Sequence, residues 1–338
     1  MKRRTTLSDV AKRADVSPKT VSRVLNDEPH VRADIRERVK RIAHEMNYHP
    51  NLAARGLIHQ RSFLIGLTYE RPSPSYVVEL QRGALDRLRG TRYRLMVLPF
   101  NHASEKPGDL IAFLRSAGLD GVLLAPPSCD VPEVLDALDD AHIAHGRISP
   151  VEMPERGATA GMDDRAAARE IARHLIDLGH RRIAILAGQE HHAASGLRMA
   201  GYRDAFAAAG IEPLAIEQGD FTLAGGQAAA RRLLALPGPA PTALLAQNDD
   251  MAVGAIQAAR DAGLSVPEDI SVAGFDDAEI ARLSWPRLTT MRQPVYDIAH
   301  AATDGLLHLL AGEPSPPRRE LDHELVVRQS TAAPPPGA

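Results

Sequence analysis

The stretch Thr6-Leu-Ser-Asp-Val-Ala-Lys-Arg-Ala-Asp-Val-Ser-Pro-Lys-Thr-Val-Ser-Arg-Val-Leu-Asn26 decides the fold of the N-terminal segment. Apolar side chains recur in its first half with the spacing of one helix face, which predicts a helix to about Ala14. Thr6, followed three residues later by an aspartate, is a capping-box-like start for that helix. After a short turn, Ser17 can cap a second helix that begins at Pro18 and runs to about residue 26.

A third helix is predicted over about residues 33–46, where apolar side chains again follow one face. Two short helices joined by a tight turn, with a third that closes the core, are typical of a helix-turn-helix DNA-binding headpiece. The second helix is the one that would enter the major groove. Its outward face carries donors and small polar groups: Lys19, Thr20, Ser22, Arg23 and Asn26.

Charge is divided unevenly along the 338 residues, whose formal net charge is −3. Residues 1–61 hold 14 basic and 7 acidic side chains, a net of +7, so the remainder holds 26 basic and 36 acidic ones, a net of −10. A basic head on an acidic body indicates that the head meets a polyanion. On charge alone, a solvated basic face is an equal alternative, and the motif decides between them.

The motif resembles the headpiece of the lactose-repressor (LacI/GalR) family of bacterial transcription regulators, and the match continues through residues 47–57. In that family the Pro-Asn-x-x-Ala segment is a hinge helix that folds against the DNA minor groove. A leucine there wedges into the central base step, and by position that leucine is Leu57. The resemblance therefore implies a headpiece over 1–50 and a hinge helix and linker over 51–61.

The match also implies contact roles. Lys19 and Arg23 can reach guanine or, alternatively, phosphate, whereas Pro18 can make only an apolar contact. Ser17 has a second reading as a helix cap, and Tyr48 as a core residue with its hydroxyl outward. Arg32 departs from the family, which often has a serine cap there. The implied DNA-contacting residues are Thr6, Leu7, Ser17, Pro18, Lys19, Thr20, Ser22, Arg23, Asn26, His30, Tyr48, Asn51, Ala54 and Leu57.

Beyond residue 62, short apolar runs alternate with stretches of helical periodicity. Short strands alternating with helices predict parallel, doubly wound α/β sheets, with a ligand beyond the carboxyl ends of the strands. The apolar runs are residues 63–68, 94–98, 121–125, 158–162, 182–186, 242–246 and 270–274. The helical stretches are residues 80–89, 164–178, 196–209, 225–236 and 251–262.

This body is also similar to the family's effector-binding core, a two-lobed, periplasmic-binding-protein-like (type I) α/β fold. The matching stretches are residues 178–188, 198–202, 247–254, 269–277 and 288–294. The resemblance implies a core over 62–330 with discontinuous lobes. Lobe 1 is expected at about 62–161 and 292–320, and lobe 2 at about 162–291 and 321–330. Residues 331–338 are expected to form a disordered tail.

The matched stretches imply an effector site. Arg198, Asn248 and Asp276 fall at family positions that hydrogen-bond the effector, and their paired groups can chelate adjacent sugar hydroxyls. Phe221 matches a position that often supplies an aromatic face, and Arg147 one where several members carry a polar contact. Two alternatives stay open, since Asp276 can act as a cap and Arg198 as a structural ion pair.

Other functions find no support in the sequence. The chain has no nucleophile elbow, P-loop or dinucleotide-binding fingerprint, so we expect no enzyme, no cofactor and no metal site. Its single cysteine, Cys129, excludes disulfides and fits a reducing cytoplasm. The sequence also lacks a signal peptide core and an apolar run long enough for a membrane span. His191 and His192 are expected in an exposed loop, and Trp285 in packing.

The sequence therefore predicts a ligand-responsive transcription regulator, not an enzyme. We expect a repressor of carbohydrate-utilisation genes that binds a pseudo-palindromic operator and is released by a sugar inducer. The alternative is the same class with a purine or nucleoside co-repressor; a sugar-binding protein without a DNA role fits the headpiece less well. Because the chain ends without a heptad repeat, a homodimer is expected rather than a tetramer.

Overall fold

The structure is a computed structural model, and it describes residues 5–25, 28–48, 61–70, 73–100, 106–190 and 192–336. Internal contacts divide the chain into two units, Met1–Ser62 and Phe63–Ala338, which are called the headpiece and the core below. Among the described residues, no helix is both long and apolar enough to cross a membrane.

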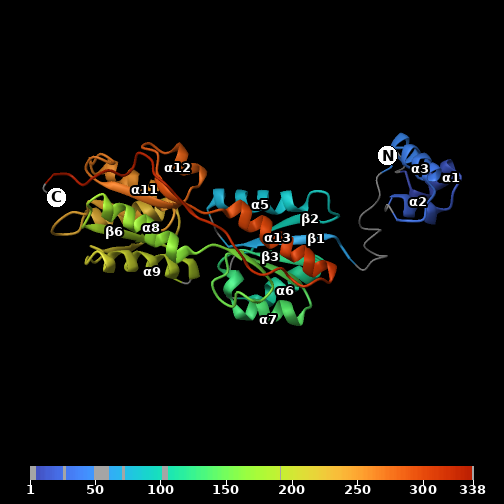
Figure 1. Ribbon diagram of the computed structural model, residues 1–338, viewed down its shortest axis with the longest axis horizontal. Coiled ribbons are helices and arrows are strands. Elements are labelled where there is room, and N and C mark those ends of the chain that lie inside the picture. Colours follow the sequence, from blue (N-terminus) through green and yellow to red (C-terminus); the bar gives the residue numbers. More distant parts are fainter. Residues whose placement is uncertain are drawn as a thin grey trace. The chain divides into compact units, whose positions relative to one another are not determined.

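The headpiece is built on helices α1 (Leu7–Ala14), α2 (Pro18–Leu25) and α3 (Ala33–Glu45) (Figure 1). The predicted capping box of α1 is present, with Asp9 N donating to Thr6 Oγ1 and Thr6 N donating to the Asp9 carboxylate. The apolar faces of the helices meet in one small core, which contains Val10, Val21, Val24, Val39 and Ile42. The predicted helix-turn-helix fold is confirmed.

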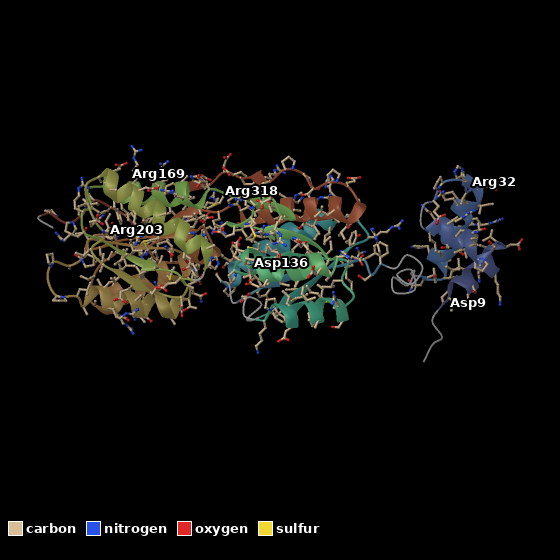
Figure 2. All side chains as sticks on the ribbon, turned by 90° about the horizontal axis from the view of Figure 1, so that it is seen from below. Asp9, Arg32, Asp136, Arg169, Arg203 and Arg318 are labelled. Carbon is tan, nitrogen blue, oxygen red and sulfur yellow. The ribbon has the colours of Figure 1, made fainter. Side chains whose placement is uncertain are left out.

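Helices α2 and α3 begin differently. Ser17 Oγ accepts from Thr20 N (3.1 Å), which satisfies one of the free N–H groups of the first turn of α2. Arg32 precedes α3 without capping it, because a guanidinium has no acceptor for the backbone N–H groups; its Nε and Nη2 donate to Asp34 instead. Figure 2 shows Arg32 and Asp9 with their side chains directed outward from the headpiece.

Lobe 1 of the core contains a six-stranded parallel sheet within the described residues, in the order β11-β5-β4-β3-β1-β2. Its strands are β1 (Leu64–Tyr69), β2 (Arg94–Pro99), β3 (Gly121–Leu124), β4 (Ala144–Ile148), β5 (Ala158–Gly161) and β11 (Arg319–Glu320). Its helices are α5 (Pro74–Leu88), α6 (Pro107–Ser116), α7 (Pro132–Asp140), α13 (Val295–Ala311) and the 3₁₀ turn η1 (Ser128–Asp130).

Lobe 2 has a second six-stranded sheet within the described residues, in the order β12-β10-β9-β8-β6-β7. Its strands are β6 (Ile183–Ala187), β7 (Ile216–Gln218), β8 (Ala243–Ala246), β9 (Ser271–Asp276), β10 (Thr289–Arg292) and β12 (Glu324–Val326), of which β12 is antiparallel to β10. Its helices are α8 (Asp164–Asp177), α9 (Ala193–Ala208), α10 (Leu223–Leu234), α11 (Asp249–Asp261) and α12 (Glu279–Leu283).

Helices cover both sheets in pairs, with α5 beside α13, α8 beside α9, and α10 beside α11 (Figure 1). Their outer faces carry charged side chains, as Asp136 on α7, Arg169 on α8 and Arg203 on α9 illustrate (Figure 2). Buried aliphatic side chains fill the space between helices and sheets. The predicted α/β fold of two lobes is therefore confirmed.

The chain passes between the lobes after β5, returns after β10 and crosses again between β11 and β12. The carboxyl ends of several strands of each sheet face the crossings. Loops that follow these strands therefore come from both lobes and meet at one place, which is where ligands bind in open α/β sheets.

The prediction of a disordered tail from residue 331 is wrong for Thr331 and Ala332. Thr331 Oγ1 lies 2.9 Å from Thr289 Oγ1, and Ala332 N donates to Ser271 Oγ (3.0 Å). The Ala332 carbonyl lies 2.9 Å from Nε2 of the buried His180. Polar groups at this end of the lobe 2 sheet take their partners from the chain beyond residue 330, and this holds the segment in place.

Candidate functional site

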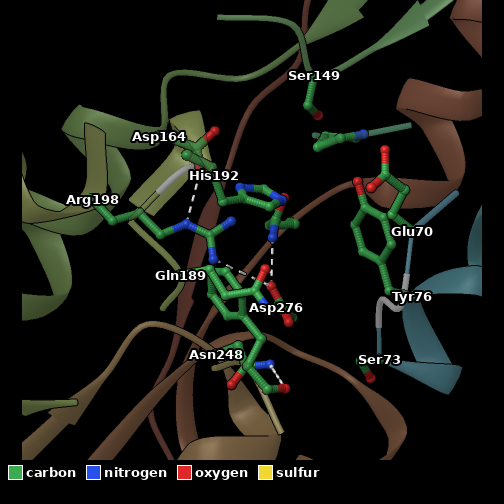
Figure 3. Close-up of a pocket in the computed structure, with 14 residues that line it drawn as sticks. Glu70, Ser73, Tyr76, Ser149, Asp164, Gln189, His192, Arg198, Asn248 and Asp276 are labelled. Atoms are coloured by element: carbon green, nitrogen blue, oxygen red, sulfur yellow. Dashed lines mark hydrogen bonds and ion pairs between the residues drawn. The ribbon is translucent and has the colours of Figure 1, made fainter. Parts of the chain in front are cut away.

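A pocket lies between the two lobes of the core (Figure 3). It takes in about 680 Å³ of space, including the open solvent at its mouth. Lobe 1 supplies Glu70, Ser73, Tyr76, Pro126 and Ser149, and the segment that leaves β10 supplies Gln293. Lobe 2 supplies Asp164, Gln189, His192, Ala194, Arg198, Phe221, Asn248 and Asp276.

Arg198, on α9, lies at the centre of the polar groups. Its Nε donates to Asp164 Oδ1 (2.9 Å), its Nη1 donates to the Gln247 carbonyl (2.6 Å), and Nη1 lies 3.8 Å from Asp276 Oδ1. The guanidinium also stacks on the Phe275 ring, 3.9 Å from its centroid. These contacts fix the orientation of the guanidinium, so it faces the pocket as a pre-organised donor.

Asp276 ends β9 in a conformation that L-residues seldom adopt, with φ at 129°. Its Oδ1 accepts from Gln293 Nε2 (2.5 Å), which ties it to the crossing segment. Burial raises the pKa of Asp276 to about 7, while the neighbouring Arg198 acts in the opposite direction. A buried carboxylate held in a strained turn and facing a cleft is typical of a binding residue.

Asn248 and Phe221 are linked on the lobe 2 side of the pocket. Asn248 caps α11, with its Oδ1 accepting from Met251 N (3.0 Å), and its Nδ2 donates to the Phe221 carbonyl (3.0 Å). Phe221 has φ at 65°, and its ring packs where any side chain at Gly188 would stand. The pocket thus brings together Arg198 on α9, Asn248 at the start of α11, Asp276 at the end of β9 and Phe221 in the loop after β7.

The structure adds pocket residues that no sequence motif predicts. His192, expected in an exposed loop, lines the pocket with its ring edge-on to Phe221, 5.2 Å between centroids. Ser73 and Ser149 line it with buried hydroxyl oxygens that have no hydrogen-bond partner among the described residues. Burial raises the pKa of the Tyr76 phenol, so its hydroxyl stays a donor across the physiological range.

Arg147 is a correction. It is fully buried in lobe 1 and is absent from the described residues that line the pocket. Its Nε donates to the Cys129 carbonyl (2.7 Å) and its Nη2 to Asp130 Oδ1 (3.1 Å). The residue lies near a strand end, as the sequence predicts. Its side chain points into the interior of lobe 1, where a carboxylate and backbone carbonyls accept its hydrogen bonds.

The headpiece residues expected to contact DNA fall into three groups. Thr6, Ser17, Pro18, Lys19, Arg23 and His30 are exposed. Leu7, Thr20, Ser22 and Tyr48 are half-buried, and of these Leu7 and Tyr48 pack against the helical core. Asn26, Asn51, Ala54 and Leu57, with the expected hinge helix, lie outside the described residues. Trp285, expected to pack, is 76% exposed.

No cluster of three or more potential metal ligands occurs among the described residues. The pocket's groups are hydrogen-bond donors and acceptors beside an aromatic ring. Chemically, this arrangement can hold a polar, hydroxyl-bearing ligand.

Comparisons with known proteins agree with both units. Residues 6–51 match the family described as bacterial regulatory proteins, lacI family, and residues 172–331 match a periplasmic binding protein-like domain. The chain is 34% identical to the HTH-type transcriptional regulator CelR of Thermobifida fusca, over 97% of this chain and 99% of that protein.

Two solved structures are similar over nearly the whole chain. One is the lac repressor dimer bound to operator and the anti-inducer ONPF, with a TM-score of 0.83, 30% identity, and coverage of 98% of this chain and 100% of that one. The other is a complex of the transcriptional regulator CelR with cellobiose, with a TM-score of 0.72, 31% identity, and coverage of 97% and 100%.

A helix-turn-helix headpiece on a two-lobed binding core defines a transcription regulator. The chain belongs to the lacI family of bacterial regulatory proteins. The relatives that it resembles are transcription regulators rather than enzymes.

Proposed function

We propose that this regulator is a repressor that binds a pseudo-palindromic operator as a homodimer and is released by a carbohydrate. The observation that carries the proposal is the convergence of Arg198, Asn248 and Asp276 beside Phe221. A guanidinium, an amide and a carboxylate each offer paired groups for neighbouring hydroxyls. The C–H face of a pyranose packs well against an aromatic ring.

The relatives support this choice of ligand. The CelR structure contains cellobiose, and a lac repressor structure contains the anti-inducer ONPF on an operator-bound dimer. These ligands are those of the two relatives. This chain shares their fold, and its pocket holds groups of the kind that bind a sugar.

Homodimerisation is supported by apolar side chains exposed on one face of the core. Val78 and Leu85 lie on α5 one heptad apart, and Leu283 and Trp285 lie at the end of α12 and just beyond it. A surface hollow is lined by residues of both α5 and α12, among them Val78. Apolar side chains of this size exposed to water favour burial by a second copy.

Operator contact is assigned to the headpiece and to residues 51–61 as the hinge. Lys19 and Arg23 stand exposed on α2, where they can reach base edges or phosphates. Leu57 is proposed as the minor-groove wedge. A dimer holds two headpieces together. Once the first headpiece has bound, the second therefore binds at a high effective concentration.

The proposal is tested with the purified full chain. Selection from a random DNA library should return a two-fold symmetric site, and a thermal-shift screen of mono- and disaccharides, purine bases and nucleosides should yield a carbohydrate that raises Tm. That carbohydrate should weaken binding to the selected site. A purine that raises Tm and strengthens DNA binding would instead establish the co-repressor alternative, and an asymmetric site would contradict the dimer.

A further inference from the structure

The guanidinium of Arg147 lies among backbone carbonyls and not in solvent. Its Nη1 donates to the carbonyls of Met153 (2.5 Å) and Arg156 (3.3 Å), and its Nη2 donates to the carbonyl of Glu152 (2.5 Å). With the bonds to Cys129 and Asp130 given above, every N–H group of the guanidinium has an acceptor. One side chain therefore binds two separate segments of lobe 1.

Asp130 strengthens the same connection from the other side. It lies in η1, and its Oδ1 accepts from Val151 N (2.9 Å) and Glu152 N (3.1 Å) as well as from Arg147. Its side chain is 9% exposed, and that of Arg147 is 0% exposed. The pair is therefore a buried ion pair, and its remaining bonds go to the loop over residues 151–156, except for the bond from Arg147 Nε to the Cys129 carbonyl.

Both joined segments continue into the lobe 1 wall of the pocket. Pro126 lines the pocket and precedes η1, and Ser149 lines it and precedes the loop over residues 151–156. Ser149 adopts φ at 48°, an uncommon conformation for serine, and its N donates to the Ala160 carbonyl (2.7 Å). Its hydroxyl oxygen is buried at the pocket (Figure 3).

We propose that Arg147 and Asp130 form a clamp that positions Pro126 and Ser149 in the pocket wall. Arg147 is then a positioning residue that acts through Ser149. The proposal rests on the proposed function only in taking this pocket as the effector site. In this proposal, the clamp determines the shape of the lobe 1 wall of the pocket.

The clamp requires an arginine. A planar guanidinium carries five N–H donors in a fixed fork, whereas a lysine ammonium carries three on one flexible point. A lysine at position 147 can keep the charge opposite Asp130, but it cannot reach all of the carbonyls. Arg147→Lys is therefore the variant that weakens the clamp without burying an unpaired carboxylate.

The test places a thiol at the wall and needs no ligand. In a chain carrying Cys129→Ala and Ser149→Cys, the rate of alkylation by iodoacetamide reports how far residue 149 is enclosed. Arg147→Lys and the neutral pair Arg147→Met with Asp130→Asn should each raise that rate about tenfold, since local opening exposes the thiol. Arg156→Met is the matched control, because it removes the two ion pairs that this residue of the same loop makes with the exposed Asp136 and Asp139, and it should change the rate less than about twofold.

Amide hydrogen exchange supplies a readout on the chain without substitutions. The N–H groups of Val151 and Glu152 should exchange about as slowly as those of β4, and Arg147→Lys should speed them while β6 in lobe 2 is unchanged. An unchanged alkylation rate in both clamp variants would overturn the proposal, as would rapid exchange of Val151 and Glu152 in the parent chain. Neither readout uses a sugar, so failure of the carbohydrate screen would leave the clamp standing.

Discussion

Arg198 Nε lies 2.9 Å from Asp164 Oδ1, and both side chains are more than nine-tenths buried. Asp164 begins α8, directly after the chain has crossed from lobe 1, whereas Arg198 lies on α9. The ion pair thus fixes the floor of the pocket at the point where the lobes join. Arg198 therefore forms a structural ion pair, and its role as a ligand donor is part of the proposed function.

Replacing Arg198 by methionine should harm both stability and binding. Asp164 would be left buried without its cation, a loss of roughly 3–5 kcal/mol in the free energy of unfolding. Urea denaturation measures this loss, and the thermal shift given by the carbohydrate should disappear. Arg165→Met, which removes an exposed pair with Asp204, is the control and should have little effect on either. An unchanged thermal shift in Arg198→Met would show that the guanidinium does not bind the carbohydrate.

Ligand affinity should depend on pH through Asp276. Burial raises its pKa to about 7, Arg198 acts in the opposite direction, and Asp250, Asp164 and the buried Asp249 are the carboxyl groups that interact with it. Below that pH the protonated acid is a poorer acceptor for sugar hydroxyls, so affinity should rise from pH 6 to pH 8, by about tenfold, and level off above. Calorimetry at several pH values measures this.

The control for that dependence is Asp276→Asn. An amide cannot titrate, so the variant should bind weakly and equally at every pH between 6 and 8. A pH dependence that persists in the variant would assign the titration to another group.

The exposed apolar face should hold the dimer together. Leu283→Asp places a charge where the partner is expected to bury it, so light scattering should report a monomer and operator affinity should fall at least tenfold, because two linked heads bind far better than one. Leu236→Asp introduces the same change at another exposed leucine of lobe 2 and should stay dimeric. A dimer that survives Leu283→Asp would place the interface elsewhere.

Leu57→Ala tests the hinge. Loss of an apolar wedge should weaken binding to the selected operator far more than binding to a random duplex, because the wedge acts through the kinked central step. Gel-shift titrations on both DNAs give the two affinities. Equal losses on the two would argue that Leu57 makes no wedge.

The sequence predicted the fold where physical signals are local. Residue spacing predicts the capping box at Thr6. Hydrophobicity predicts the continuous apolar runs, such as 121–125 in β3 and 242–246 in β8. Three of the four edge strands of the described sheets were missed, among them β7 (Ile216–Gln218), because they lack an apolar run. The missed helix α13 is buried along much of its length, so its pattern is less clearly amphipathic.

The pocket was harder to predict than the fold. Arg147 was assigned to it from the family resemblance and from its position near a strand end, whereas the direction of its side chain depends on acceptors at Cys129, Asp130 and the loop over residues 151–156. Ser73, Ser149 and Tyr76 reach the pocket from loops or a helix end of lobe 1, and serines in loops carry no distinctive signal. His192 became a pocket residue through contact with Phe221, which only the fold brings near.

The central claim is that a carbohydrate in this pocket controls the headpiece's affinity for its operator. The most direct measurement is fluorescence anisotropy of the selected operator, titrated with the full chain and with Asp276→Asn, with and without the carbohydrate from the screen. We expect the sugar to weaken operator binding about tenfold or more for the parent chain and to have no effect on the Asp276→Asn variant. An operator affinity that ignores the sugar, or that changes equally in both proteins, would contradict it.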